Sequence, residues 1–212
     1  MDSILYPEQA AYLKKFHQTQ DPLLLEMEQF AAANKIPILD SHSCTFLEFL
    51  VSVHKPRIVL EIGTAIGYTS IRLARVLGTT DSILTLEKSK PNIKLAQEFI
   101  TRSGLSNITI VEGDALQTIP TITEELDFVF LDADKEDYLA LFELAKEKLK
   151  VGGIMVVDNL LWHGMAAKES IDVKYERSTE FIRAFNDKFF SDTNFQTSFI
   201  PLGDGLGLGI KK

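Results

Sequence analysis

The sequence LDFVFLDADKEDYLALFELAKEKLKVGGIMVVDNLLWHG, which spans Leu126–Gly164, decides the fold. Leu126–Leu131 and Gly153–Val157 are short apolar runs typical of buried strands. The segment between them repeats apolar residues at helical spacing, which indicates a crossover helix between two parallel neighbouring strands. The apolar helical positions are Tyr138, Leu141, Phe142, Leu144, Ala145 and Leu149. Open α/β sheets bind their ligands at the carboxyl ends of such strands.

Oxygen-bearing side chains follow both strands at the point where each one ends. Asp132 follows the first strand, and Asp158 and Asn159 follow the second, 26 positions later. Because the strands are parallel neighbours, we expect these side chains to meet at one edge of the sheet. Carboxylate and amide oxygens suit Mg²⁺ far better than zinc. The sequence therefore predicts a magnesium site formed by Asp132, Asp158 and Asn159.

The composition fits one domain. With 212 residues, 45% of them apolar, the chain can bury a full core. No stretch is repetitive, low in complexity or similar to a linker. We expect a single domain over residues 1–212, with N-terminal helices in 1–55 and the sheet core in 56–212.

Composition and charge also disfavour several classes of protein. The single cysteine, Cys44, rules out an intramolecular disulfide, and the N-terminus has neither a basic start nor an apolar signal core. No apolar run approaches the roughly 20 residues that a membrane span needs. The net charge of −8 disfavours nucleic-acid binding through the whole surface, although not through a local basic patch. We expect a cytoplasmic protein without a membrane segment.

The rest of the chain predicts helices followed by alternating strands and helices. Tyr12–Phe16 lies in a first helix, and Asp21-Pro22 offers a cap and a first-turn proline for a second that ends at Asn34. A third helix runs from about Ser43 to Val53. The further predicted strands are residues 57–63, 82–86, 108–111, 195–200 and 206–210, and the further helices are 68–77, 91–103 and 174–190. This order predicts an α/β fold.

The first predicted strands carry the pattern of an adenosine site. The turn Gly63-Thr-Ala-Ile-Gly67 leads from a strand into a helix, and its glycines let the backbone approach a ligand. Glu87 ends the next strand, twenty residues beyond Gly67, where an acidic side chain can bind both hydroxyls of a ribose. Asp114, at the end of the third strand, is placed to meet an adenine amino group.

Two adenosine ligands compete for this site. A dinucleotide needs Gly-x-Gly-x-x-Gly, so that its pyrophosphate can lie against the helix N-terminus, and this turn does not match that spacing. S-adenosylmethionine (SAM) has no phosphate, and its amino-acid end and sulfonium fit over a looser turn. The pattern therefore favours SAM over NAD.

Four segments resemble the metal-dependent O-methyltransferases related to catechol and caffeoyl-CoA O-methyltransferases. They are Glu61–Tyr68, Leu131–Tyr138, Asp158–Gly164 and Pro201–Leu206, and the resemblance covers nearly the whole chain. It implies a Rossmann-like SAM-methyltransferase fold with a seven-stranded, mostly parallel sheet, one antiparallel strand near the edge and helices on both faces. It also implies a homodimer that forms through the N-terminal helices.

The resemblance assigns roles to individual residues. Lys135, three positions after the first metal ligand, stands at the position of the family's catalytic lysine, and a nearby cation would favour its neutral amine. Lys135 would take a proton from a hydroxyl acidified by Mg²⁺, and the oxygen would attack the methyl group of SAM. The cofactor-binding residues that it implies are Leu39, Glu61, Gly63, Gly67, Thr69, Glu87, Gly113, Asp114, Ala115 and Asp132.

The acceptor must offer two neighbouring oxygens to the metal, which catechols, caffeoyl esters and 5-hydroxyuridine all do. Lys35–Leu39 and Thr64–Arg72 are most similar to bacterial tRNA 5-hydroxyuridine methyltransferases, although Asp134 departs from the small residue expected there. We therefore predict 5-hydroxyuridine in tRNA as the acceptor, with a small phenol as the alternative. Trp162 is expected to form a wall of the acceptor site.

Two further considerations bear on this prediction. A basic patch on the acidic chain would support tRNA binding, and its candidate residues are Lys14, Lys15, Lys55, Arg57, Lys211 and Lys212. A protein of another class, a non-catalytic SAM-binding or NAD-binding module, would leave Asp132, Asp158 and Asn159 without a shared task.

Overall fold

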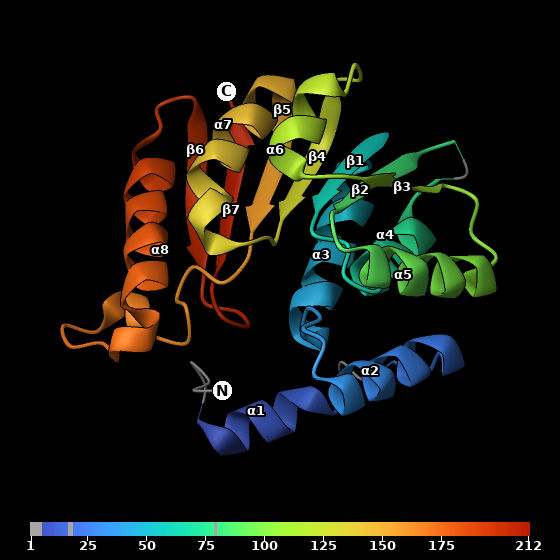
Figure 1. The fold of residues 1–212 in the computed structure, drawn as a ribbon, viewed down its shortest axis with the longest axis horizontal. Helices are drawn as coiled ribbons and strands as arrows, with labels where there is room; N and C mark the ends of the chain where they lie inside the picture. Colours follow the sequence, from blue (N-terminus) through green and yellow to red (C-terminus); the bar gives the residue numbers. More distant parts are fainter. Residues whose placement is uncertain (1–5, 17–18, 79) are drawn as a thin grey trace.

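One seven-stranded sheet forms the centre of the computed structural model, which describes residues 6–16, 19–78 and 80–212 (Figure 1). The strand order is β3-β2-β1-β4-β5-β7-β6. Strands β1 to β5 pair in parallel, whereas β7 is antiparallel to both β5 and β6. The strands are β1 (Ile58–Ile62), β2 (Ser82–Glu87), β3 (Ile108–Glu112), β4 (Leu126–Leu131), β5 (Leu149–Val157), β6 (Phe195–Ile200) and β7 (Leu206–Lys211). The predicted mostly parallel sheet, with one antiparallel strand in the edge region, is confirmed.

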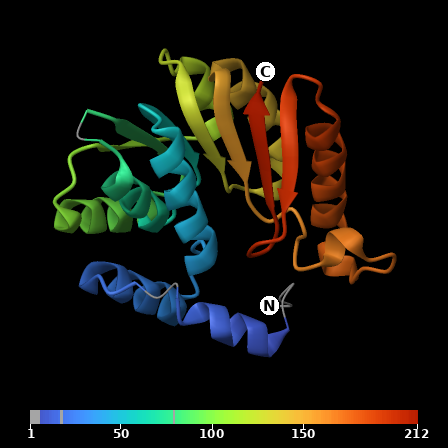
Figure 2. The ribbon, with the colours of Figure 1, turned by 180° about the vertical axis from the view of Figure 1, so that it is seen from behind.

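Helices cover both faces of this sheet. Helices α3 to α5 pack on one face, with α2 lying against α5, and α7 and α8 pack on the other (Figures 1 and 2). The helices are α1 (Pro7–Lys14), α2 (Pro22–Asn34), α3 (Ser41–His54), α4 (Tyr68–Val76), α5 (Lys90–Ser103), α6 (Ala115–Thr118), α7 (Tyr138–Lys148) and α8 (Val173–Ser191). Short 3-10 turns are η1 (Ile119–Thr121), η2 (Lys135–Asp137) and η3 (Met165–Ala167). The predicted α/β fold with helices on both faces of the sheet is confirmed.

Local sequence signals explain where several helices begin. Asp21 accepts a hydrogen bond from the Leu24 amide at 2.9 Å, and Pro22 occupies the first helical position of α2. The carboxylates of Asp40 and Asp172 cap α3 and α8 in the same way. Such caps satisfy amides that have no partner within the helix.

Strand β5 is longer than the sequence predicts. It begins at Leu149 and not at Gly153, because Leu149 already pairs with Leu126 before the register shifts and Phe128 pairs with Ile154. Two consecutive glycines, normally a sign that a strand is interrupted, here lie within an irregularity of the ladder.

Among the described residues, no helix has both the length and the apolar character needed to cross a bilayer.

The ends of β1 and β4 approach each other closely at Gly63. Its φ of +108° lies in a region that side chains disfavour, and a Cβ at this position would lie 1.9 Å from the carbonyl oxygen of Asp132. The Asp132 amide in turn donates to the Ile62 carbonyl at 3.0 Å. This contact places the turn after β1 directly beside the first residue after β4.

Replacement of Gly63 by alanine should lower the free energy of unfolding by about 2–6 kcal/mol, because backbone strain and overpacking add. Urea denaturation measures this change. The matched control is Gly104→Ala, where φ is +71° but no atom lies within 4 Å of the added Cβ, so only the strain of about 1–2 kcal/mol applies. Equal losses in the two variants would contradict the close approach.

Candidate active site

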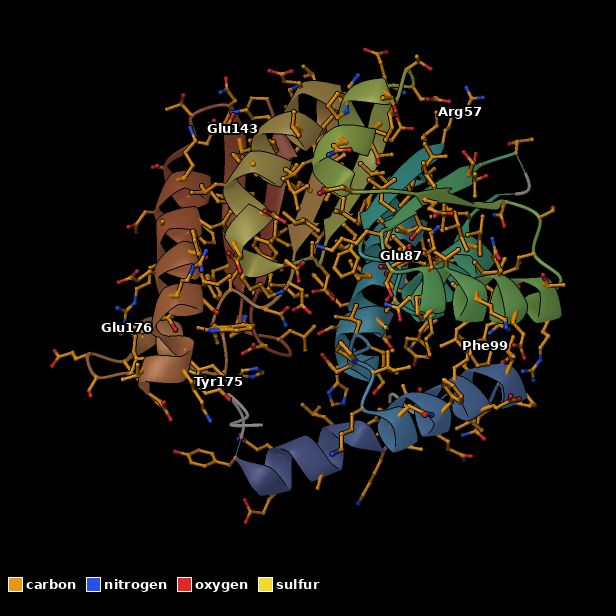
Figure 3. The ribbon with its side chains drawn as sticks, viewed as in Figure 1. Arg57, Glu87, Phe99, Glu143, Tyr175 and Glu176 are labelled. Carbon is orange, nitrogen blue, oxygen red and sulfur yellow. The ribbon has the colours of Figure 1, made fainter. Side chains whose placement is uncertain are left out.

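A cavity of about 610 Å³ lies at the carboxyl ends of the parallel strands. Glu87 lies at this edge of the sheet, beside the start of α5 (Figure 3). The structure brings together most of the side chains that the sequence singles out. The predicted residues that line the cavity are Gly63, Glu87, Gly113, Asp114, Ala115, Asp132, Lys135, Asp158, Asn159 and Trp162.

Glu87 is held in place by the backbone around it. One carboxylate oxygen accepts from the Ala65 amide at 3.0 Å, and the other accepts from the Ser89 amide at 2.8 Å. A carboxylate has about four lone-pair positions, so both oxygens can accept further hydrogen bonds. The turn after β1 and the acidic end of β2 therefore form one unit that faces the cavity.

The end of β3 forms the next part of the cavity wall. Gly113 has a φ of +144°, and its amide donates to the Glu87 carbonyl at 3.0 Å. The Asp114 carboxylate caps the short helix α6 by accepting from the Leu116 amide at 2.9 Å. One Asp114 oxygen serves this cap, which leaves the other available to a ligand.

Glu61 lies beneath the turn and does not line the cavity. Its side chain is buried, and one oxygen accepts from the hydroxyls of Ser70 and Thr85. The other oxygen has no hydrogen-bond partner among the described residues. Burial raises the pKa of the Glu61 carboxyl to about 7, while the two hydroxyls act in the opposite direction. A buried carboxyl oxygen without a hydrogen-bond partner lowers the stability of the fold.

The ends of β4 and β5 bring a lysine and three oxygen-bearing residues together. The Lys135 ammonium donates to Asp132 Oδ1 at 3.3 Å, to Asn159 Oδ1 at 2.5 Å and to the Tyr138 hydroxyl at 2.5 Å. The Asp158 carboxylate accepts from the Asn159 backbone amide at 2.7 Å. The predicted ligand set and the predicted catalytic lysine thus form one cluster.

The electrostatics of this cluster favour a bound cation. Burial raises the pKa of Asp158 well above its usual range, and the negative charge of Asp132 adds to the effect. The Lys135 ammonium lies where the oxygens of Asp132 and Asn159 converge, and it supplies a positive charge there. Two carboxylates and one amide, all oxygen donors, are a set that fits a hard divalent cation such as Mg²⁺.

Besides Glu61, three of the predicted cofactor-binding residues lie outside the cavity wall. Leu39 is buried in the core, while Pro37 and Ile38 line the cavity in its place. Gly67 and Thr69 lie at the start of α4, also away from the wall. Gly67 has a φ of +82° and shapes the turn, and Thr69 is buried. The role proposed for them stays a prediction.

Sequence reasoning missed the function of Tyr138. Its position in an apolar helical pattern indicates a core residue, and its ring is indeed fully buried. Its hydroxyl accepts from Lys135 and donates to the Asp158 carbonyl at 3.1 Å. Burial raises the pKa of Tyr138, which keeps this hydroxyl a donor. A tyrosine three residues after the lysine, among leucines, was the available signal.

The stability of the protein should fall as the pH rises between about 4.5 and 7. In that range an unfolded chain releases the Glu61 proton, whereas the folded chain retains it, because the folded pKa is raised from 4.5 to about 7. At about 1.4 kcal/mol for each pH unit between the two pKa values, the loss is on the order of 3 kcal/mol.

Urea denaturation of the wild type and Glu61→Gln at several pH values measures this change. Glu61→Gln cannot release a proton at this position, so its stability should not fall for this reason. The difference in unfolding free energy, variant minus wild type, should therefore increase up to pH 7 and then level off. A difference that does not vary with pH would show that Glu61 does not titrate in this way.

Known O-methyltransferases resemble this chain in both sequence and fold. The chain is 31% identical to caffeoyl-CoA O-methyltransferase 2 of Petunia hybrida over 77% of this chain and 72% of that protein. The crystal structure of an O-methyltransferase from Bacillus cereus in complex with SAH has a TM-score of 0.84 and 28% identity, covering 95% of this chain and 96% of that one. Cofactor-bound Rv0187 from MTB has a TM-score of 0.86 and 29% identity, covering 97% and 96%.

The family profile described as O-methyltransferase matches residues 14–212, which is nearly the whole chain. The fold, the glycine turn with Glu87 and the related cofactor-bound structures agree with this match. The chain belongs to the O-methyltransferase family, and it is a SAM-dependent O-methyltransferase related to the caffeoyl-CoA enzymes.

Proposed function

We propose that the enzyme methylates one hydroxyl of a small aromatic acceptor that carries two neighbouring oxygens, and that it does so with Mg²⁺. The observation that carries this proposal is the convergence of Asp132, Asn159 and Lys135 beside the buried Asp158 in a single cavity. Asp132, Asp158 and Asn159 would hold the metal. Bound Mg²⁺ would supply positive charge that favours ionisation of the acceptor hydroxyl.

Lys135 is placed to act as the general base. Its amine lies within 3.3 Å of Asp132 and 2.5 Å of Asn159, so an acceptor held by these residues presents its hydroxyl to the lysine. In its neutral form the amine takes the hydroxyl proton, and the acceptor oxygen forms a bond to the methyl carbon of SAM as the carbon–sulfur bond breaks. The products are the methyl ether and S-adenosylhomocysteine. Orientation of the two reactants supplies much of the acceleration.

The positions of the basic residues favour a small phenol over tRNA. Lys55 and Arg57 precede β1, and Lys211 ends β7, which is antiparallel, so all three lie at the sheet edge opposite the cavity. In Figure 3, Arg57 lies at one end of the sheet and Glu87 lies toward the other. The Lys211 ammonium is also bound to the carbonyls of Lys146 and Leu149, at 2.7 and 2.6 Å. A basic surface that guides RNA to the cavity would need these charges at the other edge.

The other basic candidates add little to the tRNA hypothesis. Lys15 is exposed just beyond α1, and the side chain of Lys14 lies outside the described part of the structure. The curated relative from Petunia hybrida is named for caffeoyl-CoA. Methylation of 5-hydroxyuridine in tRNA stays a prediction from sequence similarity, and the small phenol has the better support.

The homodimer implied by the resemblance also stays a prediction. Helix α1 presents Tyr12 to solvent, and Phe16, just after it, is exposed as well. The two rings contact each other edge to face at a centroid distance of 5.1 Å. Exposed aromatic pairs of this kind are frequent at protein interfaces, which supports the N-terminal helices as the contact.

Replacement of Asp158 by asparagine should lower kcat/KM by at least about 100-fold, because loss of a metal ligand removes several kcal/mol of transition-state stabilisation. SAM affinity, measured by isothermal titration, should change little. Without metal, the variant should be at least as stable as the wild type at pH 8, because the buried carboxylate with its raised pKa is gone.

Removal of divalent cations with EDTA should reproduce the loss of activity in the wild type, and added Mg²⁺ should restore it. Asp187→Asn, an exposed site on α8, is the matched control and should behave as the wild type. Full activity in EDTA would show that the enzyme needs no metal.

The acceptor is tested by incubating the enzyme, SAM and Mg²⁺ with catechol, with caffeoyl-CoA and with tRNA that contains 5-hydroxyuridine, at two salt concentrations. We expect methyl ethers of the phenols, with little dependence on salt. Binding to RNA would instead weaken strongly with salt, with log K falling by about 0.7 per neutralised phosphate on single strands. Formation of 5-methoxyuridine with no methylated phenol would reverse our choice of acceptor.

A further inference from the structure

The loop from Asn159 to Lys168, here named the acceptor loop, has an unusual backbone. Asn159, Trp162 and His163 have φ values of 63°, 48° and 57°, in the left-handed region that non-glycine residues disfavour. The same three residues line the cavity. Such a conformation persists only where the surrounding structure holds it, and it is frequent at functional sites.

One side of the acceptor loop is held by the turn before β7. The amides of Leu160 and Leu161 donate to the carbonyls of Gly205 and Asp204, both at 2.9 Å. The His163 amide donates to the Asp204 carboxylate at 2.7 Å. These bonds fix the amides of the first half of the loop.

The other side is held by two side chains of α8. Arg183 donates to the carbonyls of Ala166 at 3.0 Å and Met165 at 3.3 Å, and also to the carbonyl of Lys168. The Asn186 amide nitrogen donates to the Leu160 carbonyl at 2.9 Å. Hydrogen bonds from a charged donor are about twice as strong as neutral ones, and the planar guanidinium fixes their directions.

Arg183 binds backbone carbonyls and no carboxylate. Among the described residues, no Asp or Glu side chain forms an ion pair with it. Helix α8, which carries Arg183, packs against η3 in the loop. Its guanidinium donates to three carbonyls of the loop, those of residues 165, 166 and 168, and its side chain is partly buried. An arginine used in this way sets the position of a loop and contributes no charge to a surface network.

We propose that Arg183 is a positioning residue for the acceptor, a proposal that rests on the small-phenol function above. Through the carbonyls of residues 165, 166 and 168 it keeps Trp162 and His163 in the cavity wall. The acceptor then meets a wall of fixed shape opposite Lys135, whose ammonium lies 5.7 Å from the centre of the Trp162 ring. The cofactor side of the cavity comes from β1, β2 and β3, so Arg183 acts on the acceptor and not on SAM.

The test compares Arg183→Ala, Arg183→Lys and the wild type. Arg102→Ala is the control, because it removes an arginine from an exposed ion pair with Glu26, away from the loop. Four quantities are measured at a temperature where all four proteins are folded: the SAM dissociation constant, KM and kcat for catechol, and the fluorescence of Trp162. Trp162 is the single tryptophan of the chain, so its emission reports the cavity wall directly.

Arg183→Ala should reduce kcat/KM for catechol by about 10- to 100-fold, mainly through KM, because a displaced wall binds the acceptor less tightly. The emission of Trp162 should shift to longer wavelength, and acrylamide should quench it more strongly. SAM affinity should remain unchanged. Arg183→Lys keeps the charge but not the planar fork, and should fall between Arg183→Ala and the wild type.

Two results would overturn the proposal. In the first, Arg183→Ala has the same Trp162 emission and the same KM for catechol as the wild type. In the second, Arg183→Ala loses SAM affinity and acceptor affinity equally, which would indicate a general structural role. Should Arg183→Ala not fold, Arg183→Lys carries the same comparison. If the wild type methylates no phenol, the proposed function fails, whereas the fluorescence of Trp162 still decides whether Arg183 holds the wall.

Discussion

The close contact between the ends of β1 and β4 is the constraint on which the active site depends. Only a residue without a side chain fits at Gly63, because the Asp132 carbonyl occupies the place of a Cβ. The turn after β1, which we propose faces SAM, and Asp132, a proposed metal ligand, are therefore neighbours in space. In the proposed site this contact would bring methyl donor and acceptor together, and orientation of this kind supplies a large part of enzymatic acceleration.

Negative charge concentrates below and around this contact. Glu61 and Asp158 are buried carboxyl groups with raised pKa values, and Asp132 lies between them in the order of the strands. The Lys135 ammonium, bound to Asp132 and Asn159, compensates part of this negative charge. Ligands of this enzyme class are cationic in part, since SAM carries a sulfonium and the proposed metal is divalent. Burying these carboxyl groups carries an electrostatic cost that such cationic ligands would reduce.

The sequence predicts the elements well wherever periodicity is strong, as in β4 and α7, and it places Asp132, Asp158 and Asn159 at one end of the sheet, where all three line the cavity. It does not predict which way a side chain points. Leu39 lies in the core while its neighbours face the cavity, and Tyr138 serves both core and cluster. No sequence pattern indicates the contacts of Arg183, because its partners are backbone carbonyls of a segment distant in sequence. Spacing specifies elements, whereas such contacts arise only from tertiary packing.

The position of β7 has a consequence for biosynthesis. This strand lies between β5 and β6, although it follows both of them in the chain. Roughly 50 residues separate the end of β5 from the start of β7, so β7 follows β5 out of the ribosome by several seconds at about 5–20 residues per second. Throughout that interval the apolar edge of β5 has no neighbour and is open to pairing with other nascent chains. A chaperone that shields this edge would be most useful during those seconds.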